Sequence, residues 1–154
     1  MNLTPFKKEP IRLSAEGVWF HGDTEVTHAR TCELFFKNTV CKRGKFLLTS
    51  EKFDVPIQVD DAAFFVRKLQ RRDGDFLLTL SDGTEEKLDL TTLDTGPENQ
   101  LYCRVKKRTL RARFERRVYY DLMKDLVEKQ GYYGLIHQGL FYPIQKKPLT
   151  KKGK

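Results

Sequence analysis

The densest group of chemically capable side chains lies between Arg104 and Arg117, where eight of fourteen residues are Lys or Arg. Two strands joined by a turn would place Arg104, Lys106, Arg111 and Arg113 on one surface, because successive side chains of a strand point to opposite faces. Like charges this close repel one another unless carboxylates or a bound anion neutralise them. We therefore expect this basic patch to face a phosphate-bearing ligand or acidic residues of the same chain.

A second group combines histidine and cysteine. His28 and Cys32 are four residues apart and would share one face of a helix, and His21 or Cys41 could add a third ligand for zinc. No close pair of cysteines is present, and Cys32 falls where the helix should pack on the core. We therefore expect core packing here and no metal.

Adjacent carboxylates at Asp60 and Asp61 form the third group. Such a pair can serve in acid–base chemistry, hold the hydroxyls of a ribose, or cap a turn, and capping is the commonest of these roles. The sequence contains no Gly-x-Ser-x-Gly, His-Glu-x-x-His, Gly-x-Gly-x-x-Gly or Cys-x-x-Cys motif and no phosphate-binding loop. We expect a protein that is not an enzyme, with no catalytic residues and no cofactor.

Length and charge limit the kind of protein that carries these groups. The chain has 154 residues and a net charge of +8, so it suits one domain or two small modules. Residues 1–98 hold 14 Lys or Arg against 17 Asp or Glu, whereas residues 99–154 hold 15 against 4. No apolar run is long enough to span a membrane, no signal peptide is apparent, and the three cysteines suit a reducing compartment. The expected location is the cytoplasm, without membrane insertion.

An internal repeat indicates how the chain is organised. Residues 30–58 and 117–145 are identical at nine of 29 positions without a gap, where chance would give roughly two. In each copy a stretch with helical spacing leads to a glycine, Gly44 or Gly131, which we expect to end the helix. Two short strands follow and finish in Pro-Ile-Gln. We place the cap of the first helix at Thr27.

Hairpins precede both helices and extra strands separate the copies. Gly22-Asp23 and Lys107–Thr109 are the expected turns of the two hairpins, and three strands are expected between residues 64 and 90. The predicted class is α+β, with two similar hairpin–helix–hairpin modules and antiparallel sheets. The predicted boundaries are 1–62 for the first module, 63–145 for the second, and 146–154 for a basic flexible tail.

The order and spacing of several short motifs resemble the bacterial domain-of-unknown-function family 1285. In chain order these motifs are Trp19-Phe20-His21-Gly22, Arg30, Glu51-Lys52-Phe53, Ile57, Val59-Asp60-Asp61-Ala62, Arg116-Arg117-Val118-Tyr119-Tyr120-Asp121-Leu122 and Phe141-Tyr142-Pro143-Ile144. The resemblance covers roughly residues 11–144, with Ala63 and Arg117 at positions where the family commonly has proline. It implies two similar modules, a second module like a pleckstrin-homology domain, a nucleotide-like ligand between them, and a role in signal transduction.

These observations together predict a non-catalytic module that binds a small anionic ligand between its repeats. Arg30 and Arg117 stand at equivalent repeat positions near two helix starts, where backbone amides also favour anions. The predicted ligand-binding residues are Trp19, His21, Arg30, Lys52, Asp61, Arg117 and Tyr120, with Trp19 or Tyr120 stacking on a base. The alternative is a nucleic-acid-binding protein that uses the basic hairpin 104–117 and the lysine tail. The sequence does not predict an oligomeric state.

Overall fold

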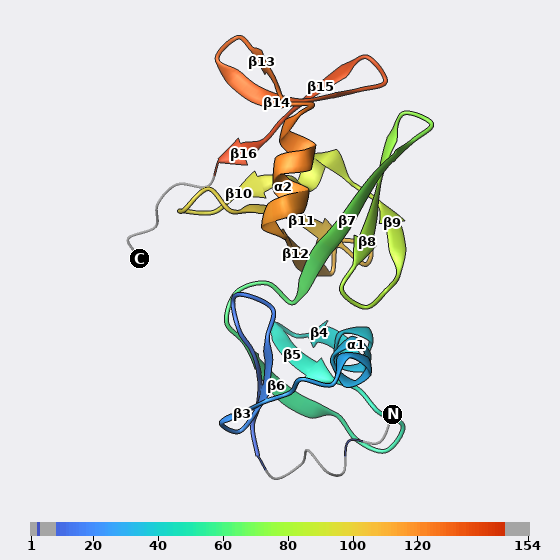
Figure 1. The fold of residues 1–154 in the computed structure, drawn as a ribbon, viewed down its shortest axis with the longest axis vertical. Coiled ribbons are helices and arrows are strands. Elements are labelled where there is room, and N and C mark those ends of the chain that lie inside the picture. The colour runs from blue at the N-terminus through green and yellow to red at the C-terminus, as the bar shows by residue number, and fades with distance from the viewer. Residues whose placement is uncertain (1–2, 4–8, 147–154) are drawn as a thin grey trace.

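The computed structural model describes residue 3 and residues 9–146, and for the last two of these only the backbone. Apart from Lys146, the predicted tail 146–154 therefore lies outside the described residues. Two bodies are stacked along the long axis of the molecule, one formed by the N-terminal strands and α1 and the other by the later strands and α2 (Figure 1). In the described part of the chain, no helix has the length and apolar character to cross a membrane.

The first module is a six-stranded sheet with one helix. Its strand order is β3-β2-β1-β6-β5-β4, and the helix packs on it through two buried phenylalanines, Phe35 and Phe36. Both rings meet Trp19 edge to face at centroid distances of 5.2 Å. The elements are β1 Ile11–Leu13, β2 Trp19–His21, β3 Thr24–Glu25, α1 Ala29–Lys37, β4 Thr39–Lys42, β5 Lys45–Leu48 and β6 Val55–Val59.

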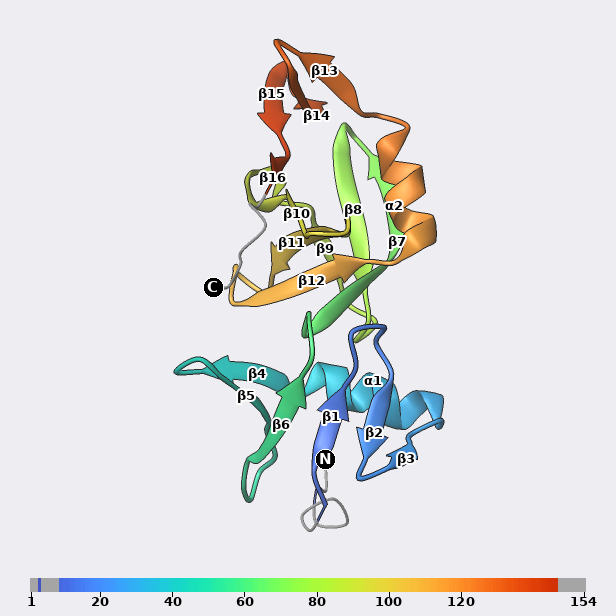
Figure 2. The same cartoon turned by 90° about the vertical axis from the view of Figure 1, so that its left-hand side faces the viewer.

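The second module contains a seven-stranded sheet in the order β16-β10-β11-β12-β7-β8-β9. Helix α2 packs on its core through Val118 and Leu122. A separate three-stranded sheet, β13-β14-β15, lies at the end of the molecule farthest from the first module (Figures 1 and 2). The elements are β7 Phe64–Arg72, β8 Asp75–Leu80, β9 Glu85–Lys87, a short 3-10 helix Leu90–Thr92, β10 Asp94–Thr95, β11 Leu101–Val105, β12 Leu110–Phe114, α2 Arg116–Met123, β13 Val127–Lys129, β14 Tyr132–His137, β15 Leu140–Pro143 and β16 Gln145–Lys146.

In both halves a helix is followed by three antiparallel strands. Each helix ends earlier than the sequence predicted. The helices end at Lys37 and Met123, before the two glycines. Gly44 and Gly131 lie instead in two-residue turns, after Arg43 and Gln130, and all four of these residues have positive φ. Hairpin turns of this kind match the twist of the strands that they join. The residues expected to extend each helix therefore form β4 and β13.

Three further details differ from the expectations. His28, not Thr27, caps α1, because its Nδ1 accepts a hydrogen bond from the Thr31 amide. The sheets are not purely antiparallel, since β1 pairs with β6, β7 with β12 and β10 with β16 in parallel. Strand β1 was not predicted. It is three residues long and sits between β2 and β6 in the first sheet.

The two modules share buried residues across their junction. The chain passes from β6 into β7 after only four residues (Figure 2). Phe65 on β7 belongs to the core of the first module, whereas its neighbours Phe64 and Val66 belong to the core of the second. Cys41 and Phe46 of the first module pack in turn against the second core.

Candidate functional site

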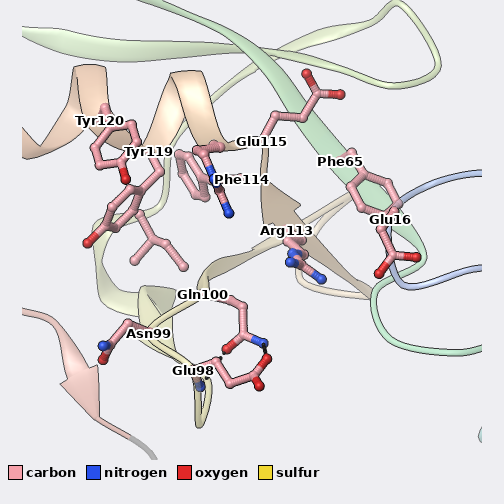
Figure 3. A pocket seen from close by; sticks show the side chains of 12 residues that line it. Glu16, Phe65, Glu98, Asn99, Gln100, Arg113, Phe114, Glu115, Tyr119 and Tyr120 are labelled. Carbon is pink, nitrogen blue, oxygen red and sulfur yellow. Dashed lines mark hydrogen bonds between the residues drawn. The ribbon is translucent and has the colours of Figure 1, made fainter.

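A pocket of about 700 Å³ opens where the β1–β2 turn of the first module faces the second module. We call it the junction pocket. Figure 3 shows Tyr119 and Tyr120 on the side of α2, Glu98, Asn99 and Gln100 on the opposite loop, and Phe65 beside Glu16. The residues that line it are Glu16, Phe65, Glu98, Asn99, Gln100, Leu101, Arg113, Phe114, Glu115, Arg116, Tyr119 and Tyr120.

Local turns hold two sides of this pocket. Glu16 projects from the β1–β2 turn, where Gly17 has a φ of +89° and a Cβ would lie 3.2 Å from the Phe65 ring. Only glycine adopts this backbone conformation without strain, so the close approach of the turn to β7 depends on Gly17. On the other side, the Gln100 side chain accepts a hydrogen bond from the Glu98 amide at 2.9 Å and donates to the Glu98 carboxylate at 3.3 Å.

The first turn of α2 forms the third side of the pocket. Glu115 is the N-cap residue but makes no side-chain cap, and its carboxylate lies 3.3 Å from Arg67 instead. The first amides of a helix lack partners inside the helix and carry partial positive charge. Arg116 is exposed beside them and makes no ion pair within the described residues, and Tyr120 is 61% exposed. The guanidinium of Arg116, the first amides of α2 and the exposed ring of Tyr120 thus lie at one corner of the junction pocket.

Asp61, predicted as a ligand-binding residue, instead joins the two modules through a cluster of hydrogen bonds and ion pairs. Its Oδ2 accepts from the Tyr102 hydroxyl at 2.6 Å and from Arg113 at 3.3 Å, and Arg111 lies 3.6 Å from its Oδ1. Arg113 also donates to the Ala15 carbonyl at 3.0 Å, in the β1–β2 turn. We call Asp61, Tyr102, Arg111 and Arg113 the junction cluster.

The junction cluster changes the acidity of its phenol. Burial, followed by the hydrogen bond to Asp61, raises the pKa of Tyr102 to about 12. The guanidinium of Arg111 lies over the Tyr102 ring at 3.4 Å from its centroid, which adds a cation–π contact. Tyr102 therefore stays a neutral donor at physiological pH.

The predicted basic patch is only partly assembled. Arg104 and Arg111 are opposite each other on β11 and β12 and share a face with Arg113. Lys106 leaves that face, because its backbone turns into the left-handed region at φ +54° and its Nζ reaches the buried Asp82 at 2.8 Å. Acidic residues of the same chain pair with every member of the patch except Arg104, for which no ion pair occurs within the described residues.

Most of the predicted ligand-binding residues lie away from the junction pocket. Trp19 is 1% exposed and packed between two phenylalanines, which corrects the expectation that its indole stacks on a ligand. His21 lies in β2, 3.9 Å from Glu9. Arg30 and Lys52 are exposed on the first module and Arg117 is exposed on α2, but none of the three lines the pocket.

Tyr120 alone of the predicted ligand-binding residues lines the pocket, together with Arg113 of the predicted basic patch. Sequence reasoning missed Glu16, the 98–100 loop and Arg116. Among these missed residues, only Arg116 had a signal in the sequence, because it lies beside Arg117 in the same family-like motif. The others come from two loops about 80 residues apart, and no local pattern marks them.

No metal site is apparent in the ranges that the structure describes, since no three His, Cys, Asp or Glu side chains come together there. His28 is used as the helix cap, and the Cys32 thiol donates to the Val26 carbonyl at 3.2 Å. Burial raises the pKa of Cys32 and, more strongly, that of Cys103. The described cysteines are all free thiols.

Comparison with known proteins gives one clear relationship. No family model and no curated protein matches the sequence. A crystal structure of a DUF1285 family protein from Silicibacter pomeroyi superimposes with a TM-score of 0.76 at 22% identity, covering 89% of this chain and 80% of that one. A second, from Shewanella baltica, gives a TM-score of 0.65 at 21% identity and covers 76% of this chain and 92% of that one. The resemblance predicted from the sequence is thus confirmed in three dimensions: this chain has the fold of the DUF1285 family proteins.

Proposed function

We propose that the protein is a non-catalytic module that binds a small anionic ligand with a planar ring, of the nucleotide class, in the junction pocket. The observation that carries the proposal is the composition of this pocket. Residues of both modules place an exposed tyrosine, guanidinium groups, side-chain amides and the first turn of α2 around one volume of about 700 Å³. That volume lies within the range of sites that hold small molecules.

Each part of such a ligand has a matching group in the pocket. Tyr120 offers a ring for stacking, and Arg116 with the first amides of α2 offers a site for phosphate. Asn99 and Gln100 can donate to and accept from the edge of a base. Arg113 is held by Asp61 and Ala15, so it serves mainly to fix the wall of the pocket.

The charge of the lining limits the number of phosphates. Glu16, Glu98 and Glu115 outnumber the two guanidiniums of the pocket, so the lining is slightly negative. A di- or triphosphate would bring excess negative charge close to these carboxylates. We therefore favour a ligand with one phosphate, such as a nucleoside monophosphate.

Three finer assignments belong to the same proposal. They are the division into modules 1–62 and 63–145, a pleckstrin-homology-like second module, and a part in signal transduction, where ligand binding would alter the contact between modules. Nucleic-acid binding has less support, because carboxylates already pair with Lys106, Arg108, Arg111 and Arg113 of the hairpin.

Calorimetric titration with nucleoside mono-, di- and triphosphates tests the proposal. We expect a monophosphate to bind, and Tyr120→Ala or Arg116→Gln to weaken its affinity about tenfold or more, since a stacked base contributes about 1–3 kcal/mol. The matched controls Tyr132→Ala and Arg117→Gln change equally exposed residues outside the pocket and should bind as the wild type does. Binding by no nucleotide, or equal losses in the controls, would contradict the proposal.

A further inference from the structure

Exposed apolar side chains are concentrated on the three-stranded sheet at the far end of the second module. Five large hydrophobic residues are exposed in the described part of the chain, and four of them, Tyr132, Tyr133, Ile136 and Leu140, lie on β14 and β15. Single exposed apolar residues are ordinary, but a cluster on one element marks a contact surface. This cluster is separate from the junction pocket.

The strand register divides this sheet into an inner and an outer face. Leu135 and Tyr142 are opposite each other and pack toward the core of the second module. Ile136 opposite Phe141, and Tyr132 opposite Lys129, point the other way. The outer face comprises Val127, Lys129, Tyr132, Ile136, Phe141 and Pro143. Of the four exposed apolar residues it therefore holds Tyr132 and Ile136, whereas Tyr133 and Leu140 share the face of Leu135.

The outer face is apolar and carries positive charge only. Tyr132 is 66% and Ile136 53% exposed, and a hollow of about 250 Å³ is bounded by Tyr132, Phe141, Pro143 and Lys129. Lys129 is the one charged residue of this face and makes no ion pair within the described residues. No acidic residue follows Glu128 in the sequence, whereas five lysines stand between positions 146 and 154.

We propose that the outer face of β13–β15 docks on an anionic lipid surface, assisted by the lysines that follow it. Peripheral attachment needs two weak signals, an apolar group that enters the interface and a basic segment that attracts anionic lipid. The outer face supplies the first, with a tyrosine suited to the interfacial region, and the five lysines supply the second. The lysines need no fixed geometry for this purpose, because their attraction depends on the surface potential.

Charge also argues against the two other occupants that such a face could have, a second copy of this chain and a different protein. A two-fold contact between copies through this face would bring the Lys129 side chains of both chains together. The centre of a protein interface is depleted in lysine, whereas Lys129 borders the hollow on this face. A negatively charged lipid surface meets both the apolar residues and the lysines.

Vesicle co-sedimentation of the full chain tests this proposal. We expect binding to phosphatidylcholine vesicles that contain phosphatidylglycerol, and little binding to phosphatidylcholine alone. The double variant Tyr132→Ser, Ile136→Ser should bind at least about tenfold more weakly, because it removes the apolar signal. Both side chains are exposed, so the variant should fold, and Tyr120→Ser is its matched control with an equally exposed ring elsewhere.

A second pair of variants separates the lysines from total charge. Lys151→Gln, Lys152→Gln, Lys154→Gln should weaken binding at least about tenfold, since each lysine near the surface contributes about fivefold. The control Arg30→Gln, Lys45→Gln, Lys52→Gln loses the same charge from the first module and should bind normally. Three results would overturn the proposal: no vesicle binding, equal losses in both charge variants, or a concentration-dependent dimer that the outer-face variant abolishes.

Discussion

Removing the carboxylate of Asp61 should destabilise the whole protein, because this one group, at the end of the first module, contacts three side chains of the second. In Asp61→Ala, the Tyr102 hydroxyl loses its acceptor and Arg113 loses its carboxylate partner, whereas Arg111 keeps Asp94 at 3.4 Å. The residue lies in the four-residue connection between β6 and β7. The substitution therefore removes interactions at the contact between the modules and leaves both hydrophobic cores unchanged.

The structure sets the size of this loss. The Asp61 side chain is 22% and that of Arg113 27% exposed, so the ion pair lies between a surface pair worth up to about 1 kcal/mol and a buried one whose breakage costs about 3–5 kcal/mol. The hydrogen bond from Tyr102 to a charged acceptor adds about 1.5 kcal/mol or more. We expect Asp61→Ala to lower the free energy of unfolding by about 2–3 kcal/mol, which lowers Tm by about 5–10 °C in a chain of this length.

Urea unfolding followed by circular dichroism measures this loss. Tyr102→Phe serves as the matched variant, because it removes the hydroxyl alone and should lose about 1.5 kcal/mol. In the double variant the losses should not add, since both changes remove the same hydrogen bond. A loss below about 0.5 kcal/mol for Asp61→Ala, or full additivity, would refute the view that Asp61 joins the modules.

Two further predictions concern other contacts of the second module. Burial acts to raise the pKa of Asp82, but hydrogen bonds from Lys106 and Thr84 outweigh burial and hold that pKa below its ordinary value. The ionised Asp82 therefore stabilises the folded state fully at neutral pH, and this contribution is lost as the pH falls below about 3.8. Acid titration of unfolding should therefore show the gap between wild type and Asp82→Asn shrinking below that pH; a constant gap would disprove the coupling. Gly134→Ala should lose about 1–3 kcal/mol in urea, because a Cβ there would lie 2.7 Å from the Pro143 backbone, whereas an unchanged midpoint would show that β15 moves aside freely.

The sequence predicted the order of elements well where the signal was local. The turn dipeptide Gly22-Asp23, for example, joins β2 to β3 as expected. The ends of the helices were wrong, because Val40 and Val127 continue a helical spacing although they lie in strands. Parallel pairing was not predictable, since it depends on contacts between strands such as β1 and β6, which lie more than 40 residues apart.

The candidate site was predicted less well than the fold. Residue type identified Tyr120 and Arg113, but it could not distinguish a tyrosine on an open helix face from Trp19, whose indole is enclosed by Phe35 and Phe36. The sequence analysis expected a counter-charge for the basic patch but could not tell which group supplies it. Asp61 does so for Arg111 and Arg113, and this could be known only after the two halves were placed together.

The position of Phe65 bears on how the protein denatures and how it can be divided. Its ring completes the aromatic cluster around Phe36 and Trp19, although β7 belongs to the sheet of the other module. A fragment that stops at residue 62 would leave a hole beside Phe36, and the complementary fragment would expose Phe65 to water. We therefore expect the two halves to unfold together in a single cooperative transition.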